Sequence, residues 1–314
     1  MAKIFCTLVA SFVLVSCSSI PANSSSQPLP TMNNDSQVMQ ADSPRFSTVK
    51  LLNGITKKDF KAQYNLAYGQ QPRQNLDIYM PFAQQATSAP LKPVIVFVYG
   101  GAWTTGNKED YLFVGESFAK AGYVTVVINY RLAPQHKYPE YVQDTALALQ
   151  WVNEHIRQYG GDHQQIIVIG HSAGAFNAVE AVDNKRWLDE VKFPVSHIKA
   201  VIGIAGPYSY DFRNDGTRNA FPANLTPDQV MPDRHIRVDA PPHLLLTGSN
   251  DKRVKLSNTQ KMKAALQQQH IPVQHQVIEG ASHVSIMASV ASRLSWYKPT
   301  RQVILDYLST VLNH

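Results

Sequence analysis

Residues 165–176 are the stretch that most constrains how this chain can fold. A short apolar run at 166–169 leads into Gly-His-Ser-Ala-Gly at 170–174, and a helix-compatible segment follows. A G-x-S-x-G pattern between a strand and a helix predicts a tight turn that exposes its serine as a nucleophile. Small residues are needed at both ends of the pattern because the strand and helix backbones pass close to the turn. The pattern is common by chance, so Ser172 needs partners elsewhere in the chain.

The segments around this turn alternate between strand and helix patterns. Near-continuous apolar runs predict strands with both faces covered, as in a parallel sheet. The alternation predicts an α/β fold with a mainly parallel, doubly wound sheet and helices on both faces. Residues 62–68 and 74–80 are expected to form antiparallel edge strands before it. The further strands are expected near 93–99, 123–129, 165–170, 198–205, 243–248 and 273–279, and the helices near 109–121, 140–158, 173–182, 254–268 and 299–312.

The connection at 206–242 is much longer than the usual link of about 2–6 residues between a strand and a helix. It predicts either an ordered loop over a site or a mobile lid, a short insertion rather than a second domain. Its aromatic residues at 208–221 suggest contact with an apolar or aromatic part of a substrate.

Two later strands end in residues that could activate Ser172. Asp251 follows the strand at 243–248, and His283 follows the strand at 273–279. Sites in such folds gather at the carboxyl ends of strands, and the chain order Ser, Asp, His is that of α/β hydrolases. Ser172 is therefore expected to attack an acyl carbonyl, with His283 as its base and Asp251 orienting the imidazole. Alternatives to Asp251 are Asn250, Asp228, Asp233 and Asp239.

A tetrahedral oxyanion needs preorganised N–H donors. The amide of Ala173, directly after Ser172, is one candidate. Others are expected from the loop after the strand at 93–99, which reads Tyr-Gly-Gly-Ala-Trp at 99–103.

This loop resembles the His-Gly-Gly-Gly-Trp motif of hormone-sensitive-lipase-like and related bacterial carboxylesterases. The resemblance, strongest to the feruloyl-esterase, acetyl-esterase and kynurenine-formamidase-like branch, implies an α/β-hydrolase fold. It implies oxyanion donors at Gly101, Ala102 and Ala173, with Gly100 shaping the turn. Tyr99 stands where the family usually has His, which makes the loop geometry less certain, and Ala102 replaces the third glycine. Supporting segments lie at 76–81, 129–134, 160–162, 240–246 and 248–251.

The first residues resemble a bacterial lipoprotein signal peptide. A positive Lys3 and an apolar run at 4–15 precede Leu-Val-Ser-Cys at 14–17, which is similar to a lipobox. The resemblance implies a signal peptide at 1–16, a lipid anchor such as palmitate on Cys17, a flexible tether over 17–45 and a catalytic domain over 46–314. Ser at position 18 favours the outer membrane of the cell envelope. The alternative is an ordinary signal peptide with a chance cysteine.

The composition of the chain argues against several classes of function. The chain has a formal net charge of +6, but no block of Lys and Arg suggests nucleic-acid binding. Its cysteines are Cys6 and Cys17, so the expected mature chain has no pair for a disulfide and no Cys-based metal site. Nucleotide-binding glycine motifs and HExxH are absent, so we expect no cofactor and no metal.

The leading hypothesis is a serine esterase acting on a small-molecule ester through an acyl-enzyme. An amidase or arylformamidase would use the same side chains. A hydrolase fold that serves as a non-catalytic envelope binding protein is the alternative of another class. The sequence leaves the natural substrate and the oligomeric state open.

Overall fold

A computed structural model describes residues 48–56, 59–82 and 90–313, with side chains from residue 51 onward. The predicted signal peptide, the predicted anchor Cys17, the tether and the domain start at 46 lie outside the described residues and stay predictions.

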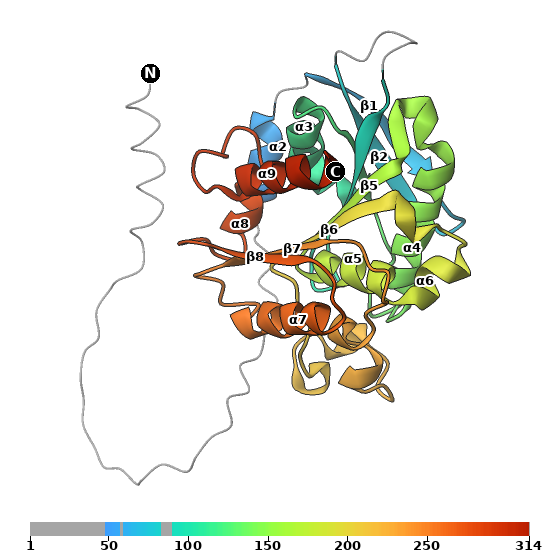
Figure 1. Ribbon diagram of the computed structural model, residues 1–314, viewed down its shortest axis with the longest axis vertical. Helices are drawn as coiled ribbons and strands as arrows, with labels where there is room; N and C mark the ends of the chain where they lie inside the picture. The colour runs from blue at the N-terminus through green and yellow to red at the C-terminus, as the bar shows by residue number, and fades with distance from the viewer. Residues whose placement is uncertain (1–47, 57–58, 83–89, 314) are drawn as a thin grey trace, which may run out of the picture. The chain divides into compact units, whose positions relative to one another are not determined.

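The described chain forms one eight-stranded sheet in the order β1-β2-β4-β3-β5-β6-β7-β8 (Figure 1). The pairs β1–β2 and β2–β4 are antiparallel, and every other neighbouring pair is parallel. Of the two strands predicted at the edge, β1 lies there, but the prediction was wrong for β2, because β2 pairs with β1 on one side and with β4 on the other. The strands are β1 (Phe60–Ala67), β2 (Asn75–Pro81), β3 (Lys92–Val98), β4 (Val124–Ile128), β5 (Gly161–His171), β6 (Ile198–Ile204), β7 (His243–Gly248) and β8 (Val273–Ile278).

Helices cover both faces of the sheet: α2, α3 and α9 lie on one side, and α4, α5, α6 and α7 on the other (Figure 1). The alternation of strands and helices predicted this arrangement, although α2, α6 and the short α8 were not foreseen. In the described residues no helix is long and apolar enough to span a bilayer. The helices are α2 (Thr48–Ile55), α3 (Leu112–Lys120), α4 (Glu140–His155), α5 (Ala173–Asp183), α6 (Lys185–Glu190), α7 (Leu256–Gln268), α8 (Ser285–Ala288) and α9 (Thr300–Leu312).

How deeply each strand is buried depends on its position in the sheet. Every residue of β4 and β7 is buried, as are the last five residues of β3, because helices cover both faces there. The edge strands β1 and β8 are mostly half-buried or exposed. The apolar runs in the sequence therefore correspond to the centre of the sheet.

The insertion between β6 and β7 is an ordered loop built from four short 3₁₀ turns. Its aromatic side chains Tyr208, Phe212 and Phe221 are at most 2 % exposed. Phe221 packs edge-on against Trp103 and stacks on Phe212. These three rings belong to the core, so the suggestion that they contact a substrate was wrong for them.

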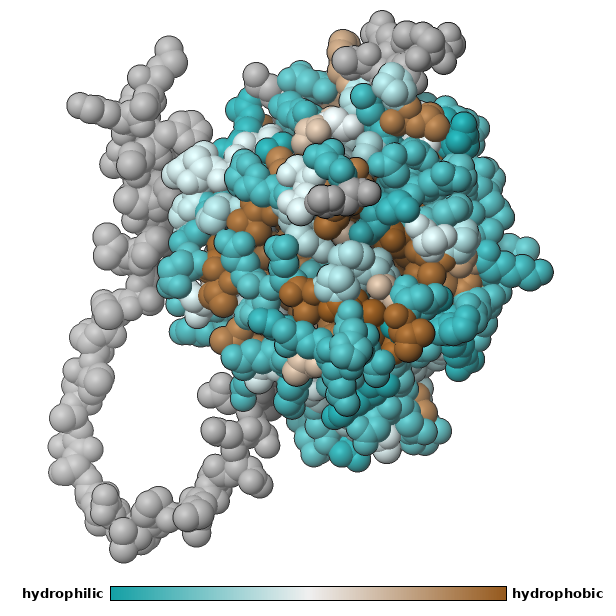
Figure 2. Space-filling view, in the orientation of Figure 1, coloured by the Kyte–Doolittle hydropathy of each residue, from teal (hydrophilic) through white to brown (hydrophobic). Residues whose placement is uncertain are grey.

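Figure 2 shows a face on which hydrophilic residues surround smaller hydrophobic patches. Large apolar side chains that stay exposed in the described chain are spread over several elements, and they include Leu51, Val238, Val284, Trp296 and Tyr297.

Candidate active site

Ser172 occupies the sharp turn between β5 and α5. Its backbone has φ 54° and ψ −125°, a strained conformation for a residue with a side chain. A Cβ on Gly170 would lie 2.2 Å from the carbonyl oxygen of Gly174, and a Cβ on Gly174 would lie 2.1 Å from the carbonyl oxygen of Val98. Both positions require glycine, which is the reason for the G-x-S-x-G spacing.

His283 and Asp251 meet Ser172 at the carboxyl end of the sheet. The Nε2 atom of His283 lies 2.9 Å from Ser172 Oγ, and its Nδ1 atom lies 2.8 Å from Asp251 Oδ2. The three side chains come from the loops after β5, β7 and β8. The structure thus brings together the set predicted from chain order.

The carboxylate of Asp251 is suited to orienting the imidazole of His283. Burial by itself raises the pKa of Asp251, but hydrogen bonds from His283 and from the amides of Val254 and Arg253 outweigh it and lower that pKa. An ionised carboxylate accepts the Nδ1–H of His283, which leaves a lone pair on Nε2 to accept the hydroxyl proton of Ser172.

The alternative acids lie elsewhere. Asp228 and Asp233 form ion pairs with Arg234, and Asp239 pairs with Arg237. None of them contacts His283 among the described interactions. The structure therefore selects Asp251 as the partner of His283.

The loop after β3 turns back sharply beside Ser172. Gly101, Ala102 and Trp103 all have positive φ, at 138°, 51° and 60°. A Cβ on Gly100 would lie 2.7 Å from the Cβ of Ser172, so this loop approaches the serine as closely as glycine allows. No protein acceptor in the described chain is bound by the amides of Gly101, Ala102 or Ala173. These N–H groups are available to a ligand, as the sequence predicts for oxyanion donors.

Trp103 anchors the far end of this loop. Its indole Nε1 donates a 2.8 Å hydrogen bond to Asn177 Oδ1 in α5. Its buried ring packs on Phe176 of α5, Tyr141 of α4 and Phe221 of the insertion. The loop is therefore fixed to the same helix whose first residue is Ala173.

Arg73, which the sequence reasoning missed, fastens the start of the loop. Its guanidinium donates hydrogen bonds to the Tyr99 hydroxyl at 2.6 Å, the Gly106 carbonyl at 2.8 Å and the Tyr130 carbonyl at 2.8 Å. The Tyr99 hydroxyl in turn donates to Asn129 Oδ1 at 2.9 Å. Tyr99 thus orders the loop from the position where the resembled family usually has His.

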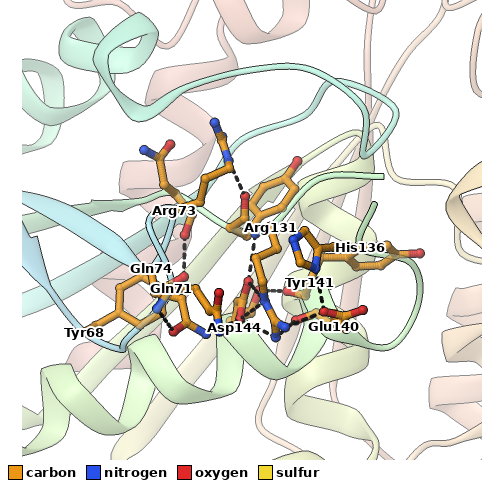
Figure 3. A network of polar contacts seen from close by, with 12 residues as sticks. Tyr68, Gln71, Arg73, Gln74, Arg131, His136, Glu140, Tyr141 and Asp144 are labelled. Atoms are coloured by element: carbon orange, nitrogen blue, oxygen red, sulfur yellow. Dashed lines mark hydrogen bonds and ion pairs between the residues drawn. The ribbon is translucent and has the colours of Figure 1, made fainter. Parts of the chain in front are cut away.

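A neighbouring polar network holds the turn that carries Arg73. Figure 3 shows Arg131, which follows β4, directed at Asp144 and Glu140 of α4. Gln74 donates a 2.7 Å hydrogen bond to the same Asp144 carboxylate. Since Gln74 adjoins Arg73, the network fixes the turn before β2 and the segment after β4 to one helix.

His171 braces the loop that carries His283. Its Nε2–H donates a 3.0 Å hydrogen bond to the carbonyl oxygen of His283. Burial and the nearby charge of His283 lower the pKa of His171 to about 3. The imidazole of His171 therefore stays neutral at ordinary pH. In the sequence, only the position of His171 directly before Ser172 indicated that its side chain would lie near the site.

An open cavity of about 590 Å³ lies against His283. It is bordered by the loops after β7 and β8. No group of three or more His, Cys, Asp or Glu side chains in the described residues is placed to hold a metal ion. The cavity is lined by Asn250, Lys252, Arg253, Ser282, His283 and Val284.

Curated relatives of the chain are named as esterases. It is 30 % identical over 245 residues to an Arabidopsis thaliana protein named a probable isoprenylcysteine alpha-carbonyl methylesterase, covering 71 % of this chain and 57 % of the relative. It is 32 % identical over 206 residues to esterase LipC of Mycobacterium tuberculosis, covering 59 % and 50 %. The chain spans about half the length of the curated relatives it matches.

Solved structures share the fold. A truncated carbohydrate esterase from gut microbiota has a TM-score of 0.68 at 19 % identity, covering 82 % of this chain and 99 % of its own. Esterase B from Lactobacillus rhamnosis has a TM-score of 0.68 at 18 % identity, covering 83 % and 90 %. The predicted α/β-hydrolase fold is confirmed. The sequence model of the BD-FAE family matches residues 76–266, more than half of the chain, and the chain belongs to that family.

Proposed function

We propose that this protein hydrolyses carboxylic esters through a covalent acyl-enzyme on Ser172. The observation that carries the proposal is the continuous hydrogen-bonded series from Ser172 Oγ to His283 to Asp251, at 2.9 Å and 2.8 Å. A hydroxyl is a poor nucleophile without such a base, and the three side chains supply it. The names of the relatives support the ester as the bond that is cleaved.

In the proposed acylation, Ser172 Oγ attacks the ester carbonyl carbon while its proton passes to His283 Nε2. The carbonyl oxygen becomes an oxyanion and accepts hydrogen bonds from the amides of Gly101, Ala102 and Ala173. Collapse of this intermediate breaks the bond to the alcohol, which leaves with the proton from His283. A water molecule, activated by the same imidazole, then attacks the acyl carbonyl and releases the acid and Ser172.

Asp251 takes no proton in this scheme. Its carboxylate holds His283 in the tautomer that has a free Nε2 lone pair, and it stabilises the imidazolium that forms. The lowered pKa of Asp251 keeps the carboxylate ionised throughout.

The test uses purified protein, p-nitrophenyl acetate and a fluorophosphonate probe. The Ser172→Ala variant should lose ester turnover by a factor on the order of 10⁴ or more and all labelling by the probe. Exposed Ser196→Ala, in the short turn before β6, is the matched control and should behave as wild type. Full turnover by Ser172→Ala would refute the acyl-enzyme scheme.

The same steps would cleave an aryl formamide, so an N-formyl arylamine is assayed beside the ester. Faster turnover of the amide by kcat/KM would make the protein an amidase rather than an esterase. No turnover of either substrate, with Ser172 unlabelled, would favour a non-catalytic binding protein.

We also propose that Cys17 carries a lipid that anchors the protein to the bacterial outer membrane. The lipobox-like residues at 14–17 support this. Metabolic labelling with palmitate and detergent-phase partitioning should be lost in Cys17→Ala. A wild-type protein that takes up no label and partitions into the aqueous phase would contradict the anchor.

A further inference from the structure

We propose that the alcohol portion of the substrate carries a negative charge, which Lys252 and Arg253 recognise. This proposal rests on the proposed esterase function and specifies the class of ester: one whose leaving alcohol has an apolar body and an anionic group such as a carboxylate.

We assign the leaving alcohol to the cavity beside His283. In ester cleavage the departing oxygen takes its proton from the imidazole, so the alcohol has to reach His283 Nε2. The candidate oxyanion donors Gly101 and Ala102 belong to the loop after β3, and none of the cavity lining comes from that loop. The 590 Å³ space is wide enough for an alcohol of aromatic size.

The cavity wall offers two cations without partners. Lys252 and Arg253 both line it and are exposed, and neither side chain forms an ion pair or hydrogen bond with any described residue. Most Arg side chains in the neighbouring insertion are paired, as Arg234 and Arg237 are with Asp228 and Asp239. An unpaired Lys–Arg pair on the wall of a substrate cavity is available to an anion.

No acidic side chain competes for these cations on the cavity wall. The Asp251 carboxylate has only 1 % of its side chain exposed and is bound to His283. The nearest exposed acid along the adjoining loop, Glu279, accepts a hydrogen bond from Ser249 and does not line the cavity. The lining residues therefore carry a net positive charge.

Backbone hydrogen bonds tie the turn that carries Lys252 and Arg253 to the side chain of Asp251. Asp251 Oδ1 accepts hydrogen bonds from the amides of Arg253 at 2.8 Å and Val254 at 3.0 Å. The carboxylate that orients His283 therefore also fixes the turn from which Lys252 and Arg253 project. Val284, 39 % exposed on the opposite loop, supplies an apolar surface beside His283.

The experiment compares two acetate esters that differ in one charge: 4-acetoxybenzoate and its methyl ester. The readout is the ratio of kcat/KM for the anionic to the neutral ester, each corrected for its hydroxide-catalysed rate. At low salt the wild-type ratio should be at least about fivefold in favour of the anion, the size of one charge–charge contact at about 4 Å in water. It should fall towards one between about 0.01 M and 1 M NaCl, as the screening length shortens from about 30 Å to about 3 Å.

The double variant Lys252→Gln/Arg253→Gln should bring the ratio to about one at low salt. The matched control is Arg157→Gln/Lys199→Gln, which removes the same charge before β5 and near the start of β6, at the opposite end of the strands. The control should keep the wild-type ratio.

The same ratio in all three proteins, with the neutral ester cleaved and Ser172 labelled by the phosphonate, would overturn the anionic-substrate proposal alone. A loss of preference in the control as large as in the double variant would also overturn it, since net charge would then be the cause. Failure of the wild type to cleave either ester, with Ser172 unlabelled, would overturn the esterase proposal and this one with it.

Discussion

The guanidinium of Arg73 donates a 2.6 Å hydrogen bond to the hydroxyl of Tyr99 and so ties the first hairpin to the loop beside Ser172. The same guanidinium donates a 2.8 Å hydrogen bond to the Gly106 carbonyl, so it binds the loop both before and after its turn. These contacts and the packing of Trp103 together hold Gly101 and Ala102 in their positive-φ conformations.

Replacing Arg73 with Gln should lower kcat for p-nitrophenyl acetate by about tenfold with little change in KM, because loosened oxyanion donors lose transition-state stabilisation. Arg73→Lys should recover only part of the loss, since an ammonium group cannot bind three acceptors in the geometry of a planar fork. Exposed Arg186→Gln is the control. An Arg73→Gln effect confined to KM or to thermal stability would contradict this positioning role.

Gly100→Ala should reduce kcat/KM by about a hundredfold or more, because displacing the oxyanion loop or Ser172 removes transition-state stabilisation. The added Cβ would sit 2.7 Å from Ser172 Cβ and 2.9 Å from the His171 carbonyl oxygen. Gly54→Ala is the matched control, since its Cβ would meet nothing within 4 Å. Circular dichroism should show both variants folded. Near-wild-type activity in Gly100→Ala would mean that the loop sits farther from the serine than the structure shows.

Asp251→Asn should lower kcat by a factor on the order of 10⁴, because an amide no longer enforces the imidazole tautomer. The folded pKa of Asp251 is depressed, so its ionisation contributes stability above the unfolded pKa of about 3.9, and this is lost as pH falls through the folded value. The stability difference between wild type and Asp251→Asn should therefore be constant near neutral pH and shrink only below about pH 4. Urea unfolding across pH measures it; a difference that disappears by pH 6 would be the contrary result.

Phe221→Ala should lower the free energy of unfolding by about 3–5 kcal/mol, the usual cost of removing a buried aromatic ring. Phe221 is 1 % exposed and contacts Trp103, Tyr141 and Phe176. Val238→Ala, 81 % exposed in the same insertion, should change stability by less than about 0.5 kcal/mol. Denaturant titrations test both. If the two variants were equally stable, Phe221 would not be part of the core and a mobile lid would again be the better description.

His171→Phe should reduce kcat by about tenfold while leaving the acid limb of the pH–rate profile in place, because His171 braces the His283 loop without titrating above about pH 4. The lost contact is the 3.0 Å hydrogen bond to the His283 carbonyl. A pH–rate profile of kcat/KM on the neutral ester measures this. An acid limb that moves by a unit or more would show that His171 takes part in proton transfer instead.

The sequence by itself determined the order of strands and helices and the residues at the strand ends. Apolar runs and G-x-S-x-G are local patterns, and parallel strands bring their carboxyl ends to one edge of the sheet. That rule, applied to the chain order Ser, Asp, His, predicts that Ser172, Asp251 and His283 lie together. It also located the loop that carries Gly101 and Ala102.

Tertiary structure decided the contacts between side chains that are far apart in the chain. Three features depend on how loops and strands pack, and no local periodicity in the sequence encodes them. They are the hydrogen bond from Arg73 to Tyr99, the burial of Phe221 against Trp103 and the position of β2 inside the sheet. The placing of Lys252 and Arg253 beside His283 likewise followed from the path of the chain in space. Chain order therefore predicted the candidate catalytic residues, and packing decided which side chains support them and the charge of the adjoining cavity.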